Sequence, residues 1–292
     1  MTYDITFPKQ IIDFAGAGGM IMISAIIVIG FIVLVRYSAK ILPGFLAMLF
    51  YLLLVVVGAE IVFSVIAVIP GINGLLSTYP LAFYGTYAVV LAVLTHLTRF
   101  IVVKYTNRDN GLELGDALMC GLGVAIGQAI ISGMELIAVS TLGETINTYG
   151  IAELLSDRSV EEIAETVADI QQIIAIEPGY YLCIGINGML DIIFQTGVLL
   201  LLYAIVKKGL PTFWHGIIIV MNAVITGASL YGGYLMGGNY VTITMIKVAV
   251  VILLVIVALK VDADYLGGEL RSFSKLKKSG GKMPKFNKVK NK

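Results

Sequence analysis

The chain has 292 residues, of which 58% are hydrophobic and only 13% are charged. A soluble domain carries roughly twice that charged fraction, so this composition excludes an ordinary water-soluble globule. The formal net charge is +1, and nine of the 20 lysines and arginines follow residue 270, so we expect no nucleic-acid partner.

Long apolar stretches dominate the chain. A spanning helix needs about 20 predominantly apolar residues, and seven stretches meet this requirement. They run approximately over residues 14–35, 41–69, 81–103, 114–142, 180–206, 212–235 and 241–259. The first residues lack the basic start and cleavage site of a signal peptide, so we expect the first stretch to remain a spanning helix. The sequence therefore predicts an all-α transmembrane bundle of about seven spanning helices.

Positive charge alternates between the connections of these stretches. The connections after the first, third and fifth stretches contain Arg36, Lys40, Lys104, Arg108, Lys207 and Lys208. The connection at 143–178 carries eight acidic residues against Arg158 alone. Because cytoplasmic loops are enriched in lysine and arginine, this pattern predicts an outer N-terminus and a cytoplasmic C-terminus. We expect a multi-pass protein of the cell membrane, in a bacterial plasma membrane, with membrane lipids as partners.

The acidic connection at 143–178 also contains a helical pattern. Ser159 with Glu162 three residues later makes a capping box. Apolar residues then recur at helical spacing, at Ile163, Val167, Ile170 and Ile174. This predicts a short amphipathic helix that rests on the outer membrane surface, caps the bundle or simply connects two spans.

The C-terminal residues differ in composition from the rest of the chain. After a transmembrane domain at 1–267, residues 268–292 mix lysines with Gly, Ser and Pro, which predicts a disordered basic cytoplasmic tail. Attraction to anionic lipid is worth about 1 kcal/mol per basic residue near the surface. An ordinary positive-inside tail accounts for this composition without any partner more specific than anionic lipid.

Ionisable and polar residues interrupt the apolar stretches. Such a residue costs several kcal/mol unless it faces a partner or water, so each is a candidate site. By position along their helices, Glu60, Glu135 and Lys247 belong to the outer half, and Gln128, Asp191, Asn222 and Thr226 to the middle. His96, Arg99 and His215 belong nearer the cytoplasm. We expect an ion pair between Glu60 and Lys247, which either fixes helix packing or serves function.

Sequence motifs for catalysis are absent. The chain has no His-Glu-x-x-His pair, no Cys-His arrangement, no phosphate-binding glycine loop and no Gly-x-Ser-x-Gly. With only two histidines, far apart in sequence, a zinc site would need carboxylates or amides to complete it. We therefore expect no catalytic residue, no metal and no cofactor.

The order and spacing of polar positions over residues 41–228 nevertheless resemble a known family. The matching positions are the THLTRF stretch at 95–100 with Thr95, His96 and Arg99, then Val124 and Gln128 in GLGVAIGQAI, then Asn187 and Gln195, and finally Asn222 and Thr226. This pattern resembles the YhfC family of intramembrane metalloproteases, relatives of the PrsW and CAAX-processing proteases. The family has a His where this chain has Val124, a Glu at Gln128, and a His-x-x-x-Asp motif at Asn222–Thr226.

The resemblance implies a metalloprotease-like fold without the family's chemistry, because the metal-binding carboxylates and imidazoles are mostly replaced. A hydrolytic zinc usually needs three protein ligands and a water. We therefore expect a non-catalytic protein that binds a membrane protein or peptide in a polar midplane cleft. That cleft would be lined by Thr95, His96, Arg99, Gln128, Asn187, Asp191, Gln195, Asn222 and Thr226.

Two other functions stay open. An active intramembrane metalloprotease would use His96 with Glu135 or Asp191. A transporter or permease component would be built around Glu60, Asp191 and Lys247.

Overall fold

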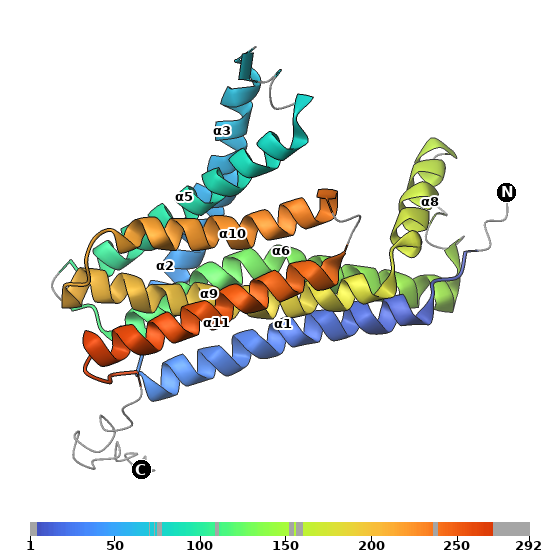
Figure 1. The fold of residues 1–292 in the computed structure, drawn as a ribbon. Coiled ribbons are helices and arrows are strands. Elements are labelled where there is room, and N and C mark those ends of the chain that lie inside the picture. Colours follow the sequence, from blue (N-terminus) through green and yellow to red (C-terminus); the bar gives the residue numbers. More distant parts are fainter. Residues whose placement is uncertain are drawn as a thin grey trace, which may run out of the picture.

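The computed structural model describes residues 5–69, 71–72, 74, 78–108, 111–151, 155, 160–235 and 239–270, and these residues are helical apart from short connections (Figure 1). The helices, in chain order, are α1 Lys9–Arg36, α2 Ile41–Phe50, the π-helix η1 Tyr51–Val57, α3 Gly58–Ala67, α5 Pro80–Thr106, α6 Leu114–Tyr149, α8 Val160–Ala175, α9 Pro178–Lys208, α10 Trp214–Leu235 and α11 Tyr240–Asp264.

Among the described residues, six helices are long and apolar enough to cross a membrane. They are α1, the continuous α2–η1–α3 helix Ile41–Ala67, α5, α6, α9 and α11. The seventh predicted span falls on α10, whose described apolar part, Trp214–Leu230, is shorter than the others. The chain is therefore a multi-pass helical membrane protein. The seventh crossing and the orientation remain predictions.

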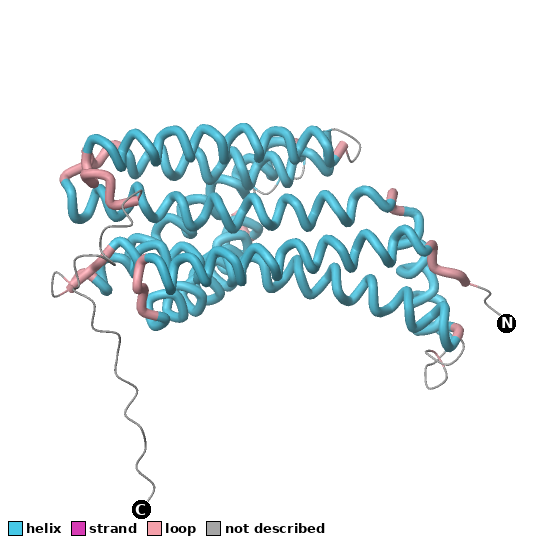
Figure 2. Tube along the Cα trace, turned by 90° about the horizontal axis from the view of Figure 1, so that it is seen from below, coloured by secondary structure: helices cyan, strands magenta, loops and turns pink. Residues whose placement is uncertain are grey.

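Helices α1, α6 and α9 pack against one another along much of their length (Figures 1 and 2). Small residues allow this close approach, as is typical of membrane helices. A Cβ added to Gly185 of α9 would collide with the backbone of Gly18 on α1, and one added to Gly123 of α6 would collide with the backbone of Gly44 on α2. The glycines thus fix how closely α1, α2, α6 and α9 approach.

The second span leaves the bundle. It is one helix interrupted by the π segment η1, and its last part, α3, extends away from the other helices together with the N-terminal part of α5 (Figure 1). Extensive contacts of α3 are with η1 and α5 only. This course separates Glu60, on α3, from α11.

The helix predicted in the acidic connection is present as α8. Its apolar face contains the buried side chains of Val167 and Ile170. The Tyr181 hydroxyl of α9 donates a hydrogen bond to the carbonyl of Ile173 at 3.0 Å, which ties α8 to the start of α9. The predicted cap residue Ser159 lies outside the described residues. Helix α6 continues to Tyr149, so it ends later than the predicted residue 142.

The opposite end of the bundle is closed by the end of α11. The Arg36 guanidinium and the Tyr37 hydroxyl both donate to the carbonyl of Leu270, each at 2.9 Å. The amide of Leu270 in turn donates to the Asp262 carboxylate at 2.8 Å. Most of the predicted basic tail, residues 271–292, lies outside the described residues.

Candidate functional site

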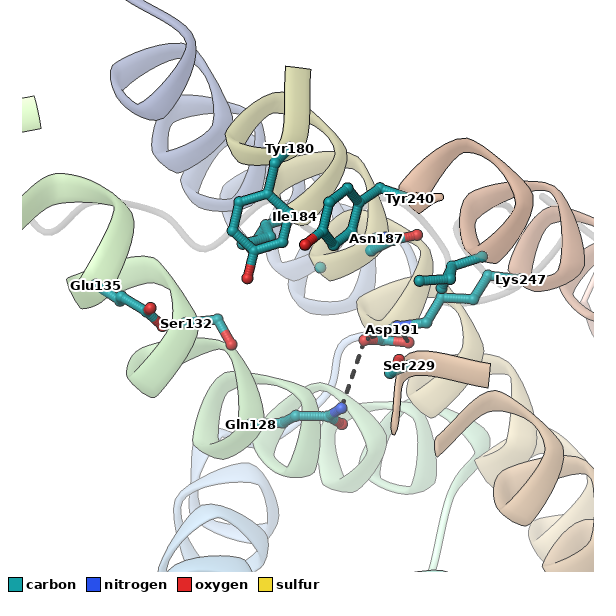
Figure 3. Close-up of a pocket in the computed structure, with 12 residues that line it drawn as sticks. Gln128, Ser132, Glu135, Tyr180, Ile184, Asn187, Asp191, Ser229, Tyr240 and Lys247 are labelled. Carbon is teal, nitrogen blue, oxygen red and sulfur yellow. Dashed lines mark hydrogen bonds and ion pairs between the residues drawn. The ribbon is translucent and has the colours of Figure 1, made fainter. Parts of the chain in front are cut away.

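A cavity of about 390 Å³ lies between α6, α9, α10 and α11 (Figure 3). We call it the four-helix pocket. Its lining residues are Gln128, Ser132, Glu135, Tyr180, Ile184, Asn187, Gly188, Asp191, Ser229, Tyr240, Ile243 and Lys247. This volume lies within the range of about 300–1,000 Å³ that is common for small-ligand sites.

Helical spacing explains why these side chains meet. On a helix, residues three or four positions apart share a face. Gln128, Ser132 and Glu135 follow this spacing on α6. Tyr240 and Lys247 do the same on α11, with Ile243 between them. The pocket is therefore formed where matching polar faces of neighbouring helices come together.

A buried ion pair lies at the inner end of the pocket. The Lys247 ammonium donates to both carboxylate oxygens of Asp191, at 3.0 Å to Oδ1 and 2.8 Å to Oδ2. The two side chains are only 4% and 14% exposed, so each charge depends on the other for stabilisation. The expected partner, Glu60, is exposed on α3 and forms no salt bridge among the described residues. The predicted Glu60–Lys247 pair is thus wrong, because similar depth along two helices does not make them neighbours.

Two glutamines extend the ion pair into the bundle. Gln128 donates from Nε2 to the Asp191 carboxylate at 3.5 Å (Figure 3). Gln195 donates from Nε2 to the Gln128 carbonyl oxygen at 2.9 Å. The result is a continuous chain of polar contacts from α11 through α9 to α6 and back to α9.

The more exposed end of the pocket, which we call its mouth, is aromatic and acidic: Glu135 is exposed, and Tyr180 and Tyr240 are half-buried. The rings of Tyr180 and Tyr240, in the first turns of α9 and α11, have centroids 4.0 Å apart and planes inclined by 53°. Figure 3 shows the Glu135 and Ser132 side chains of α6 across the pocket from Tyr180. Glu135 lies within electrostatic range of Tyr180, and it forms no salt bridge among the described residues.

A second polar group, which we call the buried cluster, consists of His96, Arg99, His215 and Asn222. Arg99 is fully buried and donates from Nη2 to the Asn222 carbonyl oxygen at 3.1 Å. Its Nε and Nη1 have no hydrogen-bond partner among the described residues. The ring nitrogens His96 Nε2 and His215 Nδ1 are 2.9 Å apart, so one donates to the other. Both contacts join α5 to α10.

Tyr51 lies between the two polar groups. It is the first residue of the π segment η1. Its hydroxyl is within electrostatic range of both Asp191 and Arg99. A Cβ added to Gly127 would stand 2.9 Å from the Tyr51 ring, so this ring packs directly on α6. Tyr51 is a residue that the sequence did not single out.

The residues predicted to form one cleft are divided between these places. Gln128, Asn187 and Asp191 line the pocket, with Gln195 behind them. His96, Arg99 and Asn222 belong to the buried cluster, where Thr95 is also buried on α5. Thr226 is half-buried on α10 and lines neither. The pocket residues Ser132, Tyr180, Ser229 and Tyr240 were missed, although Ser132 shares the helical face of Gln128.

In the part of the chain that the structure describes, no set of side chains is arranged to bind a metal ion. No three His, Cys, Asp or Glu side chains come together there in a way that could hold a metal ion. His96 is adjacent to His215, with Arg99 also in electrostatic range, and Val124 is fully buried. A nearby guanidinium disfavours a divalent cation at His96 by charge repulsion.

Fold and site together define a class: a polytopic α-helical membrane protein with a polar pocket between four of its helices. No protein-family model, curated protein or solved structure matches this chain.

Proposed function

We propose that this chain is a non-catalytic membrane protein of the intramembrane-metalloprotease type, resembling the YhfC family, and that it binds an extended peptide segment in the four-helix pocket. The observation that carries the proposal is the polar chain Lys247–Asp191–Gln128–Gln195 beside a cavity of about 390 Å³. Polar groups buried among apolar helices are costly, so a connected set beside a cavity favours a ligand site.

The chemistry of the pocket suits an unwound peptide backbone. Each peptide unit offers one N–H donor and one carbonyl acceptor, and both need partners away from water. The pocket supplies acceptors in Glu135, Asp191 and Asn187 and a donor in the Gln128 amide, while its serine and tyrosine hydroxyls serve either way. In a site of low dielectric, such hydrogen bonds are stronger than in water.

Cysteine protection tests the proposal. In a chain with Cys120 and Cys183 replaced by alanine, Ser132→Cys places a thiol on the pocket wall. Short synthetic peptides added to the protein in lipid nanodiscs should slow labelling of this thiol by a small methanethiosulfonate. Ile130→Cys, on an exposed part of α6 outside the pocket, is the control whose labelling peptides should leave unchanged. Equal labelling rates at Ser132→Cys with and without every peptide would contradict the proposal.

The same mixtures test the protease alternative. Mass spectrometry of the added peptides should find them intact after incubation. If the unmodified chain instead produces peptide fragments and His96→Ala does not, the chain is an active metalloprotease and the binding proposal is wrong.

Transport is the second candidate, and one observation favours it. Tyr51 is in electrostatic range of Asp191 in the pocket and of Arg99 in the buried cluster, so the two polar groups lie near each other. A polar route through apolar helices is what a solute pathway requires. Uptake of labelled peptide into sealed proteoliposomes, lost with Asp191→Asn, would favour transport over binding alone.

A further inference from the structure

The mouth of the four-helix pocket carries one unbalanced charge. Among the lining residues, Asp191 and Lys247 neutralise each other at 2.8 Å. Glu135 has no such partner among the described residues, so the lining carries one net negative charge. Glu135 is exposed at this end of the pocket, and a ligand with a positive group bound beside it would balance its charge.

The tyrosine pair beside Glu135 favours the same kind of ligand. The faces of aromatic rings are negative, and they attract ammonium groups within about 6 Å of the ring centroid. Tyr180 and Tyr240, with centroids 4.0 Å apart, present two such rings at the mouth. Figure 3 shows Tyr180 as the nearer of the two rings to Glu135, with Tyr240 beside it. A carboxylate opposite two rings is an arrangement that suits an organic cation.

The hydrogen-bonding groups of the pocket also favour a positively charged ligand. The carbonyl oxygen Oδ1 of Asn187, in the pocket wall, is buried and has no hydrogen-bond partner in the part of the chain that the structure describes. Glu135 adds carboxylate oxygens, which accept only. The lysine ammonium that could serve an anion is instead bonded to Asp191. An ammonium group has three N–H donors and no acceptor, which matches this surplus of acceptors.

We infer that the ligand of the four-helix pocket carries an ammonium group, held between the Glu135 carboxylate and the Tyr180 and Tyr240 rings. This inference rests on the proposed function, because it assigns the binding contacts to the same pocket. The ammonium group has two possible sources, a free small amine or the amino terminus of a peptide.

Calorimetric titration of the full chain in nanodiscs of neutral phospholipid tests the inference. The probes are butylammonium, its neutral counterpart butanol, trialanine with a free amino terminus, and N-acetyl-trialanine. Probes with an ammonium group should bind at least about tenfold more tightly than their neutral counterparts, a difference of about 1.4 kcal/mol. Glu135→Gln should remove that difference, and Tyr240→Leu should reduce it.

Glu60→Gln is the matched control, because Glu60 is an exposed carboxylate on α3, outside the pocket. It should leave binding unchanged. Thermal unfolding of each variant shows whether it is folded, and Glu135→Asp, which keeps the charge, should retain the preference for the ammonium probes.

The outcomes separate the inference from the proposed function. Equal binding of trialanine and its acetylated form, unchanged by Glu135→Gln, would overturn the ammonium site while peptide binding stands. Butylammonium binding without peptide binding would support the site with a small amine and overturn the peptide proposal. No preference for either ammonium probe over its neutral counterpart would overturn the inference.

Discussion

The four-helix pocket and the buried cluster differ in how their charges are satisfied. In the pocket, a lysine and an aspartate are bonded directly, and glutamines extend the chain. In the buried cluster, Arg99 has a neutral amide as partner, and two of its nitrogens have none among the described residues. Both contacts of the buried cluster join α5 to α10, whereas the pocket residues surround a cavity. The comparison indicates that the buried cluster holds two helices together and that the pocket is the place for a ligand.

The largest expected effect is in thiol labelling, which should be either complete or absent at each introduced cysteine. It decides on which side of the membrane the pocket opens. Thr148→Cys, at the α8 end of α6, should react with an impermeant thiol reagent on intact cells. Lys208→Cys, at the other end of α9, should react only after the membrane is opened. Both variants are made in the chain without Cys120 and Cys183. Labelling of Lys208→Cys in intact cells would reverse the predicted orientation.

Breaking the ion pair should have the largest effect on stability. Asp191→Asn leaves the Lys247 ammonium buried without a counter-charge, which should cost about 3–5 kcal/mol in the free energy of unfolding. Adding Lys247→Met should recover much of that loss, because a neutral pair carries no unpaired charge. Thermal unfolding in detergent measures both. Purely additive losses in this double-mutant cycle would exclude the pair, and Glu60→Gln should have no effect.

The next largest loss of stability is expected from a substitution that disturbs the close packing of α2 against α6. In Gly123→Ala the new methyl group would collide with the Gly44 backbone, so α2 and α6 must separate. Overpacking of this kind costs about 1–3 kcal/mol. Gly216→Ala is the control, because its Cβ would meet no atom within 4 Å and alanine favours the helix. The prediction is wrong if both variants change the unfolding temperature in the same direction.

The smallest loss of stability is expected from a substitution in the buried cluster. His215→Phe removes the hydrogen bond to His96, whose net worth is about 1 kcal/mol. Thermal unfolding should therefore show a modest loss of stability, and peptide binding in the pocket should be unchanged. A loss of peptide binding with this folded variant would show that the buried cluster takes part in the site.

The helix on which each polar residue lies was predictable, whereas its partner was not. Hydrophobic stretches are read directly from the sequence, so Lys247 and Glu60 were correctly assigned to long apolar helices, which are α11 and the α2–η1–α3 helix. Which face of each helix meets which neighbour depends on packing that involves distant segments. Glu60 is removed from α11 because α3 leaves the bundle, and Asp191 takes its place. Gln128 and Gln195, which the family resemblance assigned to one cleft, do meet.

The sequence by itself determined the class of protein, the long apolar helices and the short helix α8, because hydrophobic length and helical periodicity are local properties. It also determined that polar groups would lie within the bundle. Only the tertiary structure decided that these groups divide into a pocket and a separate cluster. The physical reason is that glycine contacts such as Gly123–Gly44 and Gly185–Gly18 set the spacing of helices far apart in the chain. That spacing, together with the departure of α3, determines which polar faces meet around a cavity.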